Sequence, residues 1–186
     1  MSAPLPEVWL RGPLAGFTAQ AMPAAHSLLQ TAEELERAVR TPRPLTIDEL
    51  WARPGGVASA GYQLAHLAGS TDRLLTYAAK RPLDDGQLAA LRAEDALLGP
   101  GDAAARPDAE ALLAAALATV RRAVDVVRDT PPSAYEAVRH VGRARIPTTV
   151  WGLLFHVAEH AQRHAGQLAT TVRMARAARA DGAPAG

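Results

Sequence analysis

The stretch from Val150 to Ala175 reads VWGLLFHVAEHAQRHAGQLATTVRMA, and its apolar residues recur at the spacing of an α-helix. At about 100° per residue, one stripe of this helix collects the side chains of Val150, Leu153, Val157, Ala161, Leu168 and Ala175. A helix with one apolar stripe buries that stripe against other elements of a core. Because strand-like alternation is almost missing elsewhere in the chain, the sequence predicts an all-α protein.

Other segments have the same helical spacing, and turn residues separate them. Long helices are expected over about 17–39, 59–80 and 108–128, and from 147–149 to about 178. Shorter ones are expected after Thr46, which has capping-box spacing with Glu49, and over 84–98. Residues 99–107 suit a loop, and 133–146 is the one region that suits an extended conformation. Four long helices predict a four-helix bundle in one domain, 1–178, with a disordered tail, 179–186.

The composition narrows the classes of function. With 20 Lys and Arg against 19 Asp and Glu, the net charge of +1 gives no sign of a nucleic-acid-binding protein. Cys is absent, which excludes disulfides, thiolate-bound zinc, iron–sulfur clusters and a cysteine nucleophile. The first residues lack the pattern of a secretion signal, and no apolar run is long enough to span a membrane. The sequence therefore predicts a soluble, cytoplasmic protein that binds neither nucleic acid nor membrane.

Three histidines, His156, His160 and His164, follow one another at four-residue intervals in the last long helix. Neighbours in this series can share one metal ion, but His156 and His164 are about 12 Å apart along the axis, too far for both to bind it. The apolar stripe selects between the two pairs, because His164 lies inside it, His160 on its flank and His156 at its edge. The pair that faces the core is therefore His160 and His164.

Two alternatives compete with this interpretation. His156, Glu159 and His160 match the zinc-protease pattern H-x-x-E-H, in which the Glu is the general base. Glu159 lies about 100° around the helix from His160, however, and the chain has little room for a protease cleft. The other alternative is a set of core or surface histidines that bind no metal.

A third ligand must come from another helix, and His66 is the best candidate among His and the acids. His26 lies early in the first helix and His140 in a loop. One face of the second long helix carries Tyr62, His66, Gly69, Arg73 and Tyr77, and this face lines a cleft or is a half-exposed surface. Tyr62, Arg73 and Tyr77 are candidate contacts for a bound small molecule. For Arg73 the alternative is an ion pair with an acid on a neighbouring helix.

A separate group of cations lies in the predicted extended region. Arg139, Arg143 and Arg145 form either an anion-binding patch or part of a solvated connection.

Four motifs together resemble the DinB/YfiT-like superfamily. They are WLRGP (9–13), LWARP (50–54), HLAGSTDRLLTYA (66–78) and HVAEHAQRHAGQL (156–168). The last motif is specific, because the family pattern is a His, three residues, then a second His followed by Arg-Gly-Gln. Here Ala165 stands where the family has that Arg, which leaves the role of the Arg without a counterpart.

The resemblance implies an up-down-down-up four-helix bundle, often a homodimer, that holds a divalent metal with one His of the second helix and two of the last. Matched by position, these ligands are His66, His160 and His164. Zinc and nickel both suit imidazole nitrogen. Similar proteins include transferases that use a low-molecular-weight thiol such as bacillithiol, so the resemblance implies a thiol co-substrate.

Three classes of function follow. The first is a metal-dependent enzyme that activates a small thiol, or water, at a three-His site with open coordination positions. The second is a non-catalytic metal- or small-molecule-binding protein. The third is a structural bundle with no metal. The sequence assigns no catalytic residue, and small molecules and a second copy of the chain are the expected partners.

Overall fold

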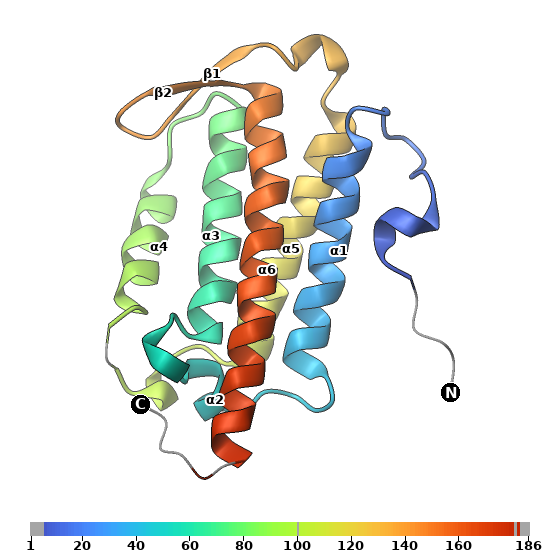
Figure 1. Ribbon diagram of the computed structural model, residues 1–186. Coiled ribbons are helices and arrows are strands. Elements are labelled where there is room, and N and C mark those ends of the chain that lie inside the picture. Colours follow the sequence, from blue (N-terminus) through green and yellow to red (C-terminus); the bar gives the residue numbers. More distant parts are fainter. Residues whose placement is uncertain (1–5, 100, 181, 183–186) are drawn as a thin grey trace.

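A computed structural model describes residues 6–99, 101–180 and 182, most of which are helical (Figure 1). The helices are α1 (Met22–Arg40), α2 (Ile47–Trp51), α3 (Ala60–Ala78), α4 (Asp85–Ala96), α5 (Ala109–Asp129) and α6 (Val150–Ala180). The strands are β1 (Val138–Val141) and β2 (Ile146–Thr149), and short 3-10 turns lie at Val8–Arg11, Pro54–Gly56, Ala103–Ala105 and Pro132–Ala134. The predicted all-α class is confirmed, with one small hairpin added to it.

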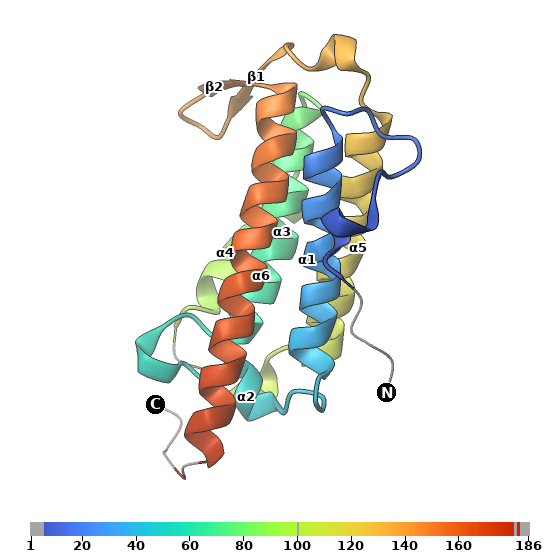
Figure 2. The ribbon, with the colours of Figure 1, turned by 45° about the vertical axis from the view of Figure 1, so that its right-hand side comes forward.

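The four long helices pack side by side, and each contacts two of the others extensively. α6 packs against α1 and α3, and α5 packs against the same two helices. The colours in Figures 1 and 2 show that α1 and α6 run in one direction and α3 and α5 in the opposite direction. The short α4 lies outside this group and packs on α3. The α3–α6 contact brings the predicted His-bearing segments together.

The core is a continuous cluster of Leu, Val and Ala side chains from all four long helices. Its fully buried members include Leu28 and Leu35 of α1, Leu64 and Leu67 of α3, Leu113 and Val120 of α5, and Leu154 and Leu168 of α6. The predicted stripe of α6 is buried as a whole, from Val150 to Ala175. Burial of this apolar surface is the main term that stabilises the fold.

Side-chain caps determine where several helices begin. Ser59 accepts a hydrogen bond from the backbone N–H of Tyr62 at the start of α3, and Asp108 does the same for Ala111 at the start of α5. Thr46 and Glu49 form the predicted capping box of α2. Each cap pairs backbone N–H groups that a helix N-terminus leaves without partners.

Several predicted boundaries differ from the structure. The first helix begins at Met22 instead of near residue 17, because residues 18–21 form a turn closed by the Thr18 carbonyl and hydroxyl. α6 begins at Val150, because 146–149 pair as β2 with β1 in an antiparallel hairpin. α6 also continues to Ala180, into the predicted tail. Residues 181 and 183–186 of that tail lie outside the described part of the chain.

Within residues 6–99, 101–180 and 182, no helix combines the length and the apolar composition that a bilayer crossing requires.

Glu49 of α2 forms an ion pair with Arg43 in the preceding loop, and the contribution of this pair to stability can be measured. Its buried carboxylate accepts two hydrogen bonds from Arg43, at 2.5 and 2.8 Å, and these bonds are the main reason why its pKa falls from 4.5 to about 2. The stabilisation is complete above the unfolded-state pKa of 4.5 and is lost as the pH falls through about 2. Because Arg43 is 54% exposed, solvent screens the pair.

Glu49→Gln is therefore expected to lower the free energy of unfolding by about 1–2 kcal/mol at pH 7. The difference from the wild type should shrink as the pH falls from about 4.5 towards 2, where the wild-type carboxylate also becomes neutral. Urea unfolding followed by circular dichroism at several pH values measures this difference in the free energy of unfolding. A difference that stays constant over this range would show that the charge of Glu49 is not its cause.

Candidate metal centre

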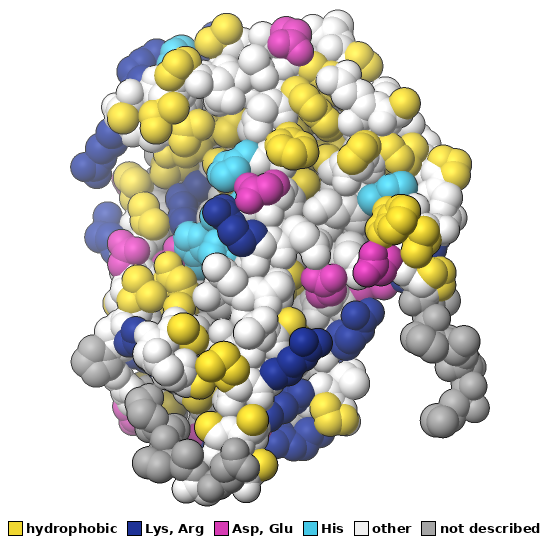
Figure 3. Space-filling model, viewed as in Figure 1, with side chains coloured by type: hydrophobic (Ala, Val, Ile, Leu, Met, Phe, Trp, Pro, Cys, Tyr) yellow, Lys and Arg dark blue, Asp and Glu magenta, His cyan; other side chains and the backbone are white. Residues whose placement is uncertain are grey.

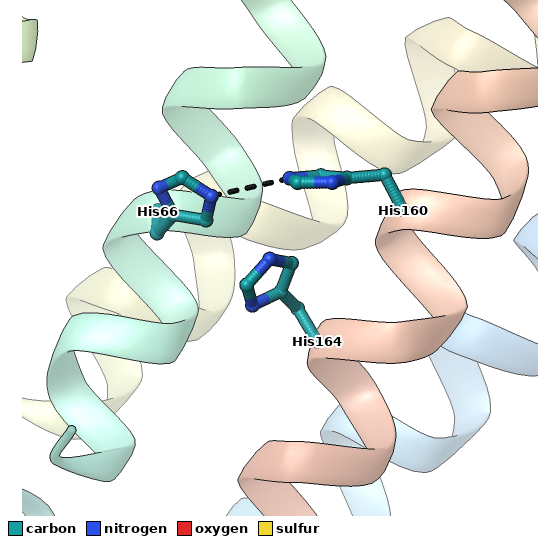
Figure 4. Close-up of side chains that lie close together, drawn as sticks. All are labelled: His66, His160 and His164. Atoms are coloured by element: carbon teal, nitrogen blue, oxygen red, sulfur yellow. Dashed lines mark hydrogen bonds between the residues drawn. The ribbon is translucent and has the colours of Figure 1, made fainter. Parts of the chain in front are cut away.

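The structure brings His66 of α3 together with His160 and His164 of α6. The imidazoles of His160 and His164 point from α6 towards that of His66 (Figure 4). Nε2 of His66 lies 3.1 Å from Nε2 of His160, and the ring centroid of His164 lies 4.5 Å from that of His66 and 4.4 Å from that of His160. One nitrogen from each ring lies within 4.8 Å of the others.

This spacing suits a single small divalent ion. Two imidazole nitrogens that each lie about 2.1 Å from a tetrahedral ion are about 3.4 Å apart. The separation between His66 and His160 is already close to that value, and His164 contributes from the next turn of the same helix. Three nitrogen donors and no sulfur leave further coordination positions for an exogenous ligand, as in catalytic rather than structural sites.

Two buried side chains hold the rings of His66 and His164. Nδ1–H of His66 donates to Glu94 of α4 at 2.6 Å, and Nδ1–H of His164 donates to Gln63 of α3 at 2.6 Å. Glu94 and Gln63 are 5% and 6% exposed. With Nδ1 engaged in this way, each ring presents Nε2 to the centre of the cluster, as metal-binding histidines do.

The surroundings of His160 and His164 keep these two imidazoles neutral. The pKa of His160 and of His164 is lowered to about 4, mainly by burial and in addition by the neighbouring His rings and Arg163. Burial raises the pKa of Glu94. The hydrogen bonds from His66 and Arg73 outweigh this effect and hold the pKa of Glu94 below its ordinary value. At pH 7 the imidazoles of His160 and His164 are therefore neutral, and Glu94 is a carboxylate.

His160 differs from the other two rings because its Nδ1 accepts a hydrogen bond from the exposed Arg163 at 2.7 Å. In that arrangement Nε2 carries the ring proton and donates to Nε2 of His66. For Nε2 of His160 to bind a metal, the proton must reside on Nδ1 and Arg163 must release the ring.

The structure separates His156 and Glu159 from the cluster. Their side chains are 47% and 44% exposed and bond to each other at 3.1 Å. Glu159 also lies 3.6 Å from Arg163 on the outside of α6. In the described part of the chain, the group that can share a metal contains neither His156 nor Glu159. The geometry gives no support to the H-x-x-E-H alternative.

The three predicted small-molecule contacts lie in different places. Tyr62 stacks on His66, with ring centroids 5.5 Å apart and planes inclined by 15°. Arg73 is bonded to Glu94 at 3.1 Å, which is the ion pair that the sequence left as the alternative. Tyr77 lies eleven residues beyond His66, about 16 Å along α3, and lines a cavity that contains none of the three histidines. Among Tyr62, Arg73 and Tyr77, only Tyr62 directly contacts one of the three histidines.

Ala165 occupies the position of the family Arg and is 1% exposed in the hydrophobic core. Its side chain faces the packed interior.

Glu94 and Gln63 are the residues that sequence reasoning missed. A signal existed for Gln63, because it is a polar residue in helical register with Leu67 on a face that packs inward. No comparable signal marked Glu94, because its place depends on how α4 docks on α3. Figure 3 shows that His side chains reach the surface over this region, next to Lys or Arg and to acidic side chains.

Gly69 makes the close approach of α4 to α3 sterically feasible. A Cβ at this position would lie 2.5 Å from Oε2 of Glu94 and 2.8 Å from Nη1 of Arg73. Gly69→Ala is therefore expected to displace Glu94 from His66 and to weaken divalent-metal binding about tenfold. Competition with a chromophoric chelator measures the affinity.

Gly166→Ala on α6 is the matched control, because a Cβ there meets no described atom within 4 Å apart from its chain neighbours and the backbone of its own helix. It should leave metal affinity unchanged and stabilise the helix by up to about 1 kcal/mol. Equal metal affinities of the two variants would contradict the role given to the contact between Gly69 and Glu94.

One of the comparisons with known proteins identifies a family for this chain. A search of curated proteins found no match. The family model of the DinB superfamily matches residues 24–168, a span that begins in α1 and ends in α6, after the last of the three histidines. Because the match covers most of the chain, the protein belongs to the DinB superfamily.

Proposed function

We propose that this protein binds one divalent metal ion, zinc or nickel, through His66, His160 and His164, and that it activates a low-molecular-weight thiol there for transfer to an electrophilic small molecule. The observation that carries the proposal is the convergence of three imidazole nitrogens within 4.8 Å, two of them on rings oriented by Gln63 and Glu94. A bound ion of this kind supplies Lewis acidity that lowers the pKa of a coordinated thiol or water.

The chain's own residues prepare the site in three ways. Glu94 and Gln63 fix the proton of His66 and of His164 on Nδ1 and so reserve Nε2 for the metal. Arg73 balances the charge of Glu94 and leaves that carboxylate bound to His66. Tyr62 covers one face of His66 and forms an aromatic wall beside it.

The absence of Cys supports a thiol in particular, because the chain has no sulfur nucleophile of its own to compete for the open positions. His66 is 21% exposed, so a small molecule can approach the cluster from solvent.

The proposal includes an up-down-down-up four-helix bundle, supported by the packing of α5 and α6 on α1 and α3 and by the helix directions. It also includes a homodimer with no nucleic-acid or membrane partner. Light scattering coupled to size-exclusion chromatography measures the oligomeric state.

Substitution with cobalt tests the thiol step. Titration of the cobalt-loaded protein with bacillithiol, glutathione or cysteine should produce a sulfur-to-cobalt charge-transfer band in the near ultraviolet. The band should be missing from His66→Ala, and it should form with wild-type affinity in Arg121→Gln, a surface variant on α5. If cobalt binds but no thiol produces the band, the thiol step is wrong, and the site either activates water or binds metal without turnover.

A further inference from the structure

A cavity that is separate from the three histidines lies where the C-terminal end of α3 meets the β1–β2 hairpin. Its volume is about 350 Å³. The polar side chains that line it are Tyr77, Lys80, Arg81, Arg139, His140 and Arg145. Lys and Arg side chains gather at this edge of the molecule, where Figure 1 places the hairpin (Figure 3).

The charge of this cavity has one sign. Four permanent cations line it, and among the described residues no Asp or Glu does. Elsewhere on the surface, cations pair with acids: Arg11 with Glu33, Arg40 with Glu110, Arg122 with Asp72 and Arg179 with Asp48. Within the described part of the chain, no such ion pair involves Lys80, Arg81 or Arg145. Uncompensated cations around a concave surface raise the local concentration of anions.

The backbone at two of these cations adopts an unfavourable conformation. Lys80 and Arg145 have φ values of 58° and 49°, and every other described residue with positive φ is a glycine. Lys80 follows α3 at the position where helices usually place Gly, and its N–H and that of Arg81 bond back to the carbonyls of Tyr77 and Thr76. A side chain with Cβ is strained in this region, so glycine would fit both positions better. Instead, each position carries a cation that lines the same cavity.

Arg139 is held in place between the two elements. Its Nε donates to the carbonyl of Ala78 in the last turn of α3 at 2.6 Å, and its Nη1 donates to the carbonyl of Val138 at 2.9 Å. The guanidinium is therefore fixed before a ligand arrives, which reduces the entropy lost on binding.

We propose that this cavity binds a small organic anion with several negative charges, of the phosphate-ester or polycarboxylate class. Arg guanidinium groups match the oxygens of phosphate and carboxylate with paired hydrogen bonds, and Lys80 adds a point charge. The volume is that of a small-metabolite pocket, and Tyr77 and Val138 supply an apolar wall for the organic part of the ligand. The site is independent of the metal.

Calorimetric titration of the full chain with pyrophosphate, citrate and acetate at physiological ionic strength tests this. Pyrophosphate or citrate should bind with one-to-one stoichiometry, and acetate, with one charge, at least about tenfold more weakly. Tighter binding of pyrophosphate assigns the ligand to the phosphate esters, and tighter binding of citrate assigns it to the polycarboxylates.

Lys80→Gly and Arg145→Gly each remove one lining cation and also relieve the positive φ, so neither should lower the thermal midpoint. Each should weaken binding at least about tenfold. Arg143→Gln is the matched control, because Arg143 lies in the same hairpin, carries the same charge and does not line the cavity. Absence of binding to both polyanions, or an equal loss in Arg143→Gln, would overturn the proposal.

Discussion

His164→Ala is expected to weaken divalent-metal binding by at least about a hundredfold, because it removes one of three nitrogens that converge within 4.8 Å. The two remaining rings cannot replace it, since His66 and His160 already occupy the other two sides of the cluster. Metal content of untagged protein after equilibration with zinc or nickel measures the loss, and titration against a competing chelator gives its size.

His156→Ala is the control on the same helix. Its ring lies 5.3 Å from that of His160 but bonds outward to Glu159 and is half exposed. This variant should keep stoichiometric metal. Loss of metal in His156→Ala with retention in His164→Ala would contradict the ligand set and revive the H-x-x-E-H pair.

Glu94→Ala is expected to reduce both stability and metal affinity. It leaves the largely buried Arg73 without its carboxylate and His66 without the acceptor for Nδ1–H. Removal of one partner from a buried ion pair destabilises a protein by about 3–5 kcal/mol, and loss of a group that orients a ligand weakens metal binding by about 10–100-fold. Chemical unfolding and chelator competition measure the two effects.

Two further variants separate charge from geometry. Glu94→Gln keeps an oxygen that can accept from His66 and should retain more of the metal affinity than Glu94→Ala. Glu159→Ala removes an exposed acid of the same region and should change metal affinity little. If Glu94→Ala binds metal as tightly as Glu159→Ala does, Glu94 does not support the site.

Much of the helical architecture could be predicted because the signals are local. The stripe of α6 is periodic over seven turns, and Thr46 with Glu49 marks the start of α2 by spacing alone. The sequence predicts too early a start for α1, because residues 17–21 are compatible with a helix by composition but form a turn at Thr18. The hairpin is only partly predicted by the sequence. Residues 147–149, which the sequence assigns to the start of the last helix, pair with β1 as part of β2.

The candidate site was predictable where one helix contains the information. The stripe of α6 selected His160 and His164 over His156, and the structure places these two in the cluster. His66 could be assigned as the third ligand only through the family resemblance. The pattern of residues on its face of α3 does not show whether that face lines a cleft or is exposed to solvent.

The sequence could not identify which residues meet across helices. The ion pair between Arg73 and Glu94 exists because α4 docks on α3 beside Gly69, and no spacing in the sequence encodes that contact. Tyr77 shares a helical face with His66 but lies too far along the axis to reach the same ligand. A shared face gives direction around a helix and says nothing about distance along it.

Anomalous scattering at the zinc and nickel edges, from a crystal of untagged protein, tests the central claim most directly because it identifies the ion and its ligands together. We predict one peak per chain, about 2.1 Å from Nε2 of His66, His160 and His164. A metal bound instead by His156 and His160, or a crystal grown with zinc and nickel that shows no peak at this cluster, would contradict it.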